Sequence, residues 1–378
     1  MELFGQSSTE MILFFILYGV SGVVPLMAAL YLLLRRGNAI APGIKPPVRL
    51  RRWTASFFAV ATLGHVWWLL FYIYSGDLQS VAYLVIVMLD CVLMFTTFAG
   101  TLLAMLQDRR RSVRPALMAM ILFVVLWGAY IAYPSKLIEQ IVSVYLLLLG
   151  LAFTGYMVVS IRQYGRWLND NYADLENKKV WLFQAVALGS MLLFVLYALA
   201  TDIVFIWLLH IIALVLVGLL LWRVETLPQL ESTSTEASRT ASDPELATQE
   251  TESSNPSPLI SNIDLVQIEQ LLKEHCVGTQ LYLKHDLTVQ QLAQAIGTNR
   301  FYLSQYFSRQ GITYNTYINN LRIDHFFARY EELAAAGQPI VAQQLARESG
   351  YRSYSTFGLA FKQRTGQTVT TWMRQAEQ

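Results

Sequence analysis

The chain has 378 residues, of which 54% are hydrophobic and 14% are charged, and its formal net charge is +2. An average soluble protein has about 25% charged residues, so this composition excludes an ordinary soluble globular protein. The two cysteines, Cys91 and Cys276, are too few for a disulfide framework and form no Cys-x-x-Cys metal motif.

Long apolar runs fill residues 1–225 and predict a membrane domain. Seven of them are long enough to cross about 30 Å of hydrocarbon: 11–34, 53–74, 79–106, 115–133, 137–161, 180–200 and 203–222. Thr201 and Asp202 interrupt the last apolar stretch, where we expect a tight hairpin between two spans. The first run is longer than a signal-peptide core and is expected to remain as a span.

The basic residues between the runs predict the orientation in the membrane. The loops at 35–52, 107–114 and 162–179 hold 14 Lys and Arg residues, whereas the opposite side offers only Lys136. By the positive-inside rule the N-terminus is outside and, after seven crossings, the C-terminal domain is cytoplasmic. We therefore expect the bacterial inner (cytoplasmic) membrane, with the lipid bilayer as a partner.

Three ionisable residues, His65, Asp90 and His210, fall near the middle of predicted spans. A charge at that depth costs several kcal/mol unless it faces a partner or the interior of the bundle. One interpretation is a hydrogen-bonded cluster that fixes helix packing. A second is a candidate sensor for protons or for a small-molecule or envelope signal. A metal or haem site is a third, although no spacing requires one, and we predict no cofactor.

Residues 226–258 predict a linker, because they contain 13 Ser or Thr, 4 Pro and 6 acidic residues, a single Arg and no aromatic residue. Such a segment buries too little apolar surface to offset its chain entropy, so we expect an acidic disordered linker between domains 1–225 and 259–378. A flexible linker cannot transmit a rigid movement. Control by dimerisation, by release of a docked domain or by proteolysis is then expected.

The pattern Leu-Ala-x-x-x-Gly occurs twice, at 292–297 and 345–350, and each copy predicts the first helix and the turn of a helix-turn-helix. In the first copy Thr288 is suited to cap the helix and Gly297 to make the turn. The second helix of each copy has two apolar side chains four residues apart. These pairs are Leu303 with Phe307, and Phe357 with Phe361.

The segment between the copies, Tyr314 to Leu333, predicts one long helix. Its length of about 30 Å is close to one turn of DNA, about 34 Å. One chain is therefore expected to present two recognition helices to successive major grooves. The expected fold class is all-α, with a seven-helix transmembrane bundle and a cytoplasmic domain of two helix-turn-helix units joined by a long helix.

The C-terminal domain resembles the AraC family of transcriptional regulators over about 110 residues. The resemblance rests on LTVQQLAQAIG at 287–297, YLS at 302–304, YINNLRI at 317–323, SGYRSYSTF at 349–357, FKQRTG at 361–366 and WMR at 372–374. It implies sequence-specific binding to double-stranded promoter DNA through the second helix of each copy. The chain departs from the family at Gly358 and Leu359, where larger polar residues are common, and in a shorter 309–311 segment.

Groove position and the resemblance together give the predicted DNA-contact residues. In the first copy they are Asn299, Arg300, Phe301, Ser304 and Gln305, and in the second Arg352, Ser353, Ser355 and Thr356. Arg352, Lys362 and Arg364 are the predicted phosphate contacts of the second copy. Residues 259–378 contain 11 basic and 9 acidic residues, and so small a positive charge is weak evidence for DNA binding. The prediction of DNA binding therefore rests on the doubled motif.

The sequence thus predicts a membrane-embedded one-component transcription factor whose membrane domain is a sensor. A second copy of the chain and RNA polymerase are further candidate partners. The alternative is a transporter or small-molecule receptor whose C-terminal domain binds protein partners. No nucleophile–base pair, phosphate loop or metal-ligand spacing is found in the sequence, so we do not expect an enzyme.

Overall fold

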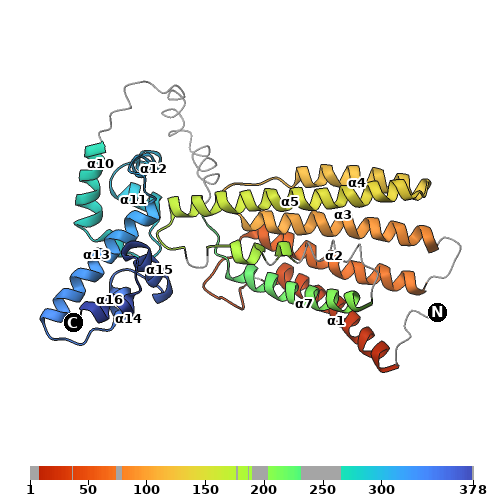
Figure 1. Ribbon diagram of the computed structural model, residues 1–378, viewed down its shortest axis with the longest axis horizontal. Helices are drawn as coiled ribbons and strands as arrows, with labels where there is room; N and C mark the ends of the chain where they lie inside the picture. The colour runs from red at the N-terminus through yellow and green to blue at the C-terminus, as the bar shows by residue number, and fades with distance from the viewer. Residues whose placement is uncertain are drawn as a thin grey trace, which may run out of the picture. The chain divides into compact units, whose positions relative to one another are not determined.

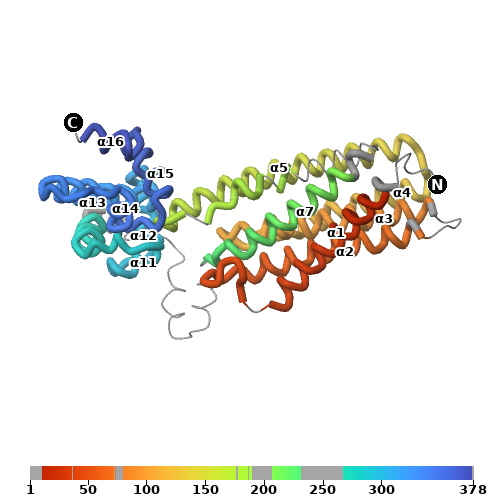
Figure 2. The backbone as a smooth tube through the Cα atoms, turned by 90° about the horizontal axis from the view of Figure 1, so that it is seen from below, coloured from red at the N-terminus to blue at the C-terminus, as the bar shows by residue number. Residues whose placement is uncertain are grey.

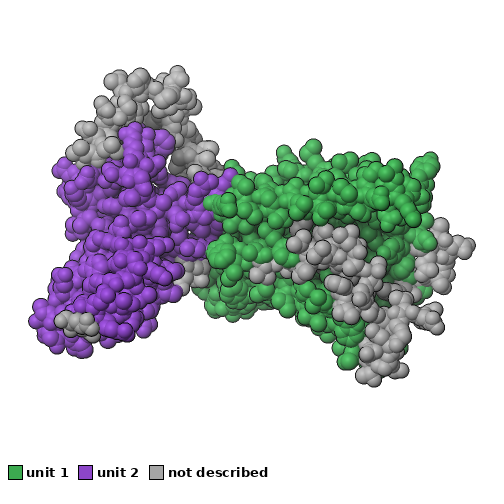
Figure 3. Space-filling model, viewed as in Figure 1, with its two compact units in different colours: residues 1–162, 180–236 green, residues 163–179, 237–378 purple. Residues whose placement is uncertain are grey.

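The computed structural model describes residues 8–35, 37–73, 79–175, 178–185, 187–189, 203–230 and 265–376. It divides into two compact units, which Figure 3 shows in different colours. Unit 1 comprises Met1–Arg162 and Val180–Glu236, and unit 2 comprises Gln163–Lys179 and Ala237–Gln378. Within the described residues every regular element is a helix, which confirms the expected all-α class.

Unit 1 is a bundle of long apolar helices. They are α1 (Ser8–Leu34), α2 (Val48–Ile73), α3 (Gln79–Met105), α4 (Arg114–Ala132), α5 (Lys136–Asn171, of which unit 1 includes the part up to Arg162) and α7 (Ile203–Thr226). Helix α2 packs between α1 and α3, α7 packs against α1 and α2, and α4 packs against α3 (Figures 1 and 2). Large apolar side chains such as Phe15 and Met118 are exposed on the outside of this bundle, as expected for helices that contact lipid.

Six described helices are long and apolar enough to cross a membrane. They correspond to six of the seven predicted spans. The remaining one, 180–200, is described only at 180–185 and 187–189, and the hairpin expected at Thr201–Asp202 lies outside the described residues. The count of seven therefore stays a prediction.

The chain leaves α7 through a short packed segment. Leu227 and Leu230 are buried in unit 1. The side chain of Gln107 donates to the Pro228 carbonyl at 3.0 Å and accepts from the Leu230 amide at 2.9 Å. The first residues of the predicted linker are thus held in place, and 231–258 lie outside the described residues.

Two of the basic residues in the predicted loops have partners within unit 1. Arg51 donates to the carbonyls of Leu32 and Arg35 at the C-terminus of α1, at 2.6 and 2.8 Å. Arg111 is buried and pairs with Asp108 at 2.7 Å. A cation near a helix C-terminus satisfies carbonyls that lack an intrahelical partner, so Arg51 stabilises the end of α1, and Arg111 is held by its ion pair.

Unit 2 contains the end of α5 and the C-terminal helices. These are α10 (Leu265–Leu272), α11 (Val289–Ala295), α12 (Arg300–Arg309), α13 (Tyr314–Ala335), α14 (Ala342–Glu348), α15 (Tyr354–Thr365) and α16 (Val369–Ala376), with short turns at Lys273–Val277 and Leu281–Leu283. Helix α13 has 22 residues and matches the predicted long helix.

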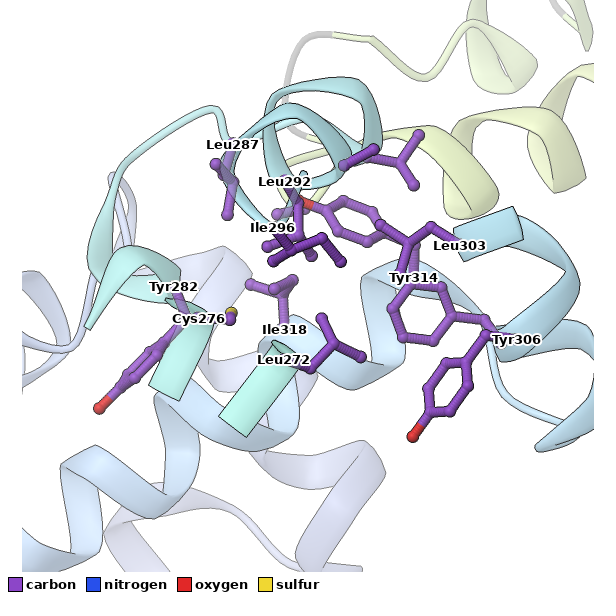
Figure 4. Close-up of a cluster of buried hydrophobic side chains, with 14 of the residues drawn as sticks. Leu272, Cys276, Tyr282, Leu287, Leu292, Ile296, Leu303, Tyr306, Tyr314 and Ile318 are labelled. Atoms are coloured by element: carbon purple, nitrogen blue, oxygen red, sulfur yellow. The ribbon is translucent and has the colours of Figure 1, made fainter. Parts of the chain in front are cut away.

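Unit 2 has two hydrophobic cores, one for each helix-turn-helix. In the first, shown in Figure 4, Leu292 and Leu303 face the start of α13 at Ile318. In the second, Phe326 of the same helix packs between Phe357 and Phe361 of α15 at ring distances of 4.7 and 5.8 Å. Because α13 contributes to both cores, it connects the two helix-turn-helix motifs of unit 2.

Candidate nucleic-acid interface

The first helix-turn-helix consists of α11 and α12. Thr288 caps α11 by accepting a hydrogen bond from the Gln291 amide at 3.2 Å, as predicted. Gly297 makes the turn with a φ of +72°, a left-handed conformation that costs a glycine little. Leu303 and Phe307 of α12 are buried, which leaves the opposite face of this helix outward.

The outward face of α12 presents several of the predicted DNA-contact residues. Phe301 is 69% exposed, Gln305 is exposed, and Ser304 and Arg300 are half-buried. Asn299 has a different role, because its side-chain oxygen accepts from the Tyr302 amide at 3.0 Å and caps the helix. The first turns of α12 therefore combine an aromatic ring, an amide and a hydroxyl on one exposed face.

The second helix-turn-helix consists of α14 and α15, with Gly350 at the turn at a φ of +86°. Ser353 caps α15 by accepting from the Thr356 amide, and its hydroxyl lies 2.7 Å from that of Ser355. Ser355 is exposed and Thr356 is half-buried, while Leu359 is 63% exposed on the same helix. This face is poorer in polar groups than that of α12.

The predicted phosphate contacts lie in unlike surroundings. Lys362 is exposed. Arg364 forms an ion pair with Asp324 and donates to a carbonyl of α13. Arg352 lies 3.6 Å from a carboxylate oxygen of Asp286. Both arginines thus have a carboxylate partner within the protein, whereas the side chain of Lys362 is solvent-accessible.

Sequence reasoning missed Arg322, the largest fully buried side chain of the described residues. Its guanidinium donates to the carbonyls of Tyr282 at 2.7 Å and Lys284 at 2.8 Å, and lies over the ring of Tyr351 at 5.4 Å. Burial lowers the pKa of this guanidinium, which nonetheless remains cationic at neutral pH. Arg322 thus connects the first core to the second. Its position four residues after Ile318, on the buried face of α13, was the only sequence signal.

Two histidines stabilise the same junction. His285 lies with Nδ1 3.0 Å from the carbonyl of Gly350, and His325 with Nδ1 3.3 Å from the Ser349 hydroxyl. Burial, and secondarily the nearby Arg329, lower the pKa of His325. His325 is half-buried and His285 is exposed, and both side chains contact the turn of the second helix-turn-helix.

Two of the three candidate sensor residues are neighbours in unit 1. The rings of His65 and His210 lie 5.8 Å apart, and His65 Nε2 lies 2.9 Å from the hydroxyl of Ser21. The third, Asp90, accepts hydrogen bonds from the indoles of Trp67 at 3.0 Å and Trp68 at 2.6 Å. Among the described residues no cluster of three metal-ligating side chains is found.

Residues 292–375 match a helix-turn-helix domain family of the AraC type. Members of this family are DNA-binding regulators and are generally not enzymes. The match spans α11 to α16 and so includes both recognition helices. No curated protein and no solved structure matches the chain. The C-terminal region is therefore similar to the helix-turn-helix domains of DNA-binding regulators, and the same chain contains six described helices that are long and apolar enough to cross a membrane.

Proposed function

We propose that the chain is a membrane-embedded one-component transcription factor whose cytoplasmic domain binds promoter DNA under the control of its membrane domain. The observation that carries this proposal is the doubled helix-turn-helix, whose α12 exposes Phe301 and Gln305. The described apolar helices support a location in the membrane. Seven crossings with the N-terminus outside, in a bacterial inner membrane, agree with the distribution of basic loops.

The two helices are proposed to play unequal roles. An amide such as that of Gln305 can bond an adenine edge bidentately, and an exposed aromatic ring packs on a thymine methyl. Helix α15 offers mainly Ser355 and Lys362, which suit one base contact and phosphate contact. We therefore assign most of the base discrimination to α12 and a positioning role to α15.

The signal is proposed to act at the polar cluster of His65, His210 and Ser21 in unit 1. Its rings and hydroxyl lie within hydrogen-bonding or ring-contact distance on α1, α2 and α7. The same cluster is the observation that favours the alternative function of a transporter or receptor. Ligand uptake that survives deletion of 259–378, without transcriptional change, would support that alternative.

The test uses the full chain in lipid nanodiscs and a library of random duplex DNA. We expect enrichment of a defined sequence, with an affinity that falls steeply as salt rises. Gln305→Ala is expected to relax the selected sequence, whereas Gln344→Ala, an exposed glutamine on α14, should leave it unchanged. If no sequence is enriched above nonspecific binding, the proposal is wrong.

A further inference from the structure

The turn that follows α5 contributes to the core of the first helix-turn-helix. Ala173 is 1% exposed and belongs to the same buried cluster as Leu292 and Ile318. Its amide donates to the Leu287 carbonyl at 3.1 Å, next to an antiparallel bridge between Tyr172 and Thr288. The yellow-green ribbon in Figure 4 is this part of the chain. Residues more than 100 positions apart thus share one core.

Asn315, near the start of α13, holds this turn with its side-chain amide. The amide nitrogen donates to the carbonyls of Tyr172 at 3.1 Å and Ala173 at 2.7 Å. The amide oxygen accepts from Asn319 at 3.0 Å. A single side chain therefore satisfies two backbone carbonyls of the turn that follows α5.

A buried lysine provides a second attachment. Lys178 is 7% exposed, and its ammonium group lies 3.0 Å from a carboxylate oxygen of Asp286 and 2.8 Å from the Asp174 carbonyl. It also lies over the ring of Tyr172 at 5.3 Å. The Asp286 carboxylate is shared with Arg352, a predicted phosphate contact.

The first recognition helix is close to the same segment. Asp170, on the last turn of α5, attracts Arg300 electrostatically. Arg300 is the first residue of α12 and a predicted DNA contact. The segment therefore contacts residues next to the starts of α11 and α13. It also interacts electrostatically with Arg300 of the first motif and shares the Asp286 carboxylate with Arg352 of the second.

We propose that residues 170–175 and 178, the docking segment, complete the first helix-turn-helix, and that DNA binding is controlled through this attachment. The inference rests on the proposed function. Helix α5 is uninterrupted from Lys136 to Asn171, so the docking segment continues directly from a predicted membrane span. The docking segment therefore provides a short route from the span to the DNA-binding motif, whereas the predicted flexible linker at 226–258 cannot transmit a rigid movement. Because α12 packs on the core that Ala173 completes, undocking lowers the affinity for DNA.

Docking is tested by a disulfide in the full chain in nanodiscs, with Cys91→Ser as background. Tyr172 and Thr288 form an antiparallel, non-hydrogen-bonded pair. The Cα atoms of such a pair are about 4.5 Å apart, a separation that a disulfide can bridge. We expect Tyr172→Cys with Thr288→Cys to form an intramolecular disulfide on mild oxidation. Tyr172→Cys with Gln363→Cys, which lies on α15, should not. Failure of the first pair to crosslink overturns the docking.

The consequence for DNA binding is tested with two asparagines of α13. Asn315→Ala removes two hydrogen bonds to the docking segment and is expected to weaken DNA binding about tenfold. Asn320→Ala is the matched control and should bind as the wild type does. Equal affinity of Asn315→Ala and wild type overturns the inference. If the wild type selects no DNA although the disulfide forms, it is the proposed function that fails.

Reactivity of Cys276 gives a readout that does not depend on DNA. This thiol is fully buried in the same cluster as Ala173, and burial raises its pKa to about 11. Its alkylation therefore requires opening of the core. We expect Ala173→Glu and Asn315→Ala to accelerate the alkylation, and Asn320→Ala to leave it unchanged. Full protection of Cys276 in Ala173→Glu would contradict the assignment of this residue to the core.

Discussion

Replacement of Arg322 by methionine should weaken the junction between the two helix-turn-helix units. Methionine keeps most of the aliphatic volume but leaves the carbonyls of Tyr282 and Lys284 without a donor. The hydrogen bond to Tyr282 is buried, and one to a charged donor contributes about 1.5–3 kcal/mol. The bond to Lys284 is partly exposed, so water replaces it at a cost of about 0.5–1 kcal/mol. The free energy of unfolding should fall by about 2–4 kcal/mol.

The assay is alkylation of Cys276 in the full chain at increasing urea, with Cys91→Ser as background. With a urea dependence of about 2 kcal/mol/M, the midpoint should fall by about 1–2 M. Arg329→Met is the control on the same helix. Its side chain is 38% exposed and pairs with Glu332 and Glu348, and such pairs contribute at most about 1 kcal/mol. Equal midpoints for the two variants would refute the role given to Arg322.

Three further predictions follow from single positions. Gly350→Ala should destabilise unit 2 by more than about 1 kcal/mol, because φ is +86° and a Cβ atom would lie 2.8 Å from the backbone of Leu283. Gly358→Ala is the control: it lies at an open helical position and should stabilise unit 2 by about 0.5–1 kcal/mol in the same urea assay. The lowered pKa of His325 favours the neutral ring in the folded state, so the stability that this ring contributes is present above about pH 6.5 and is lost as pH falls below that value. The difference between urea midpoints at about pH 7.5 and about pH 5.5 should be smaller in His325→Gln than in the wild type, and an equal difference would contradict this. Lys362→Ala should reduce the slope of log affinity against log salt by about 0.9 without changing the selected DNA sequence, and an altered sequence would show that Lys362 reads bases.

Local features of the sequence were sufficient for the helices and turns. The apolar runs predicted six helices that the structure describes. Thr288 caps α11, and Gly297 and Gly350 make turns with positive φ, as their residue types indicate. The spacing of Leu303 and Phe307 correctly gave the buried face of α12. These features depend on backbone conformation and on neighbours within one or two helical turns, so a single sequence contains them.

Several predicted contact residues have partners within the protein. Asn299 and Ser353 cap the helices that follow them, which is a local role. The pairing of Arg364 with Asp324 is decided by tertiary packing. A sequence pattern assigns a polar residue to a face but does not give the partner that occupies it.

The sequence by itself determined the helical elements and the doubled motif. Only the tertiary structure showed Arg322 between two cores, and Ala173 inside a core formed mainly by residues 268–318. The physical reason is that burial of an arginine, or of a loop residue far away in the chain, is stabilised by carbonyls and apolar side chains that only folding brings together. Such pairings leave no periodicity in the sequence from which they could be predicted.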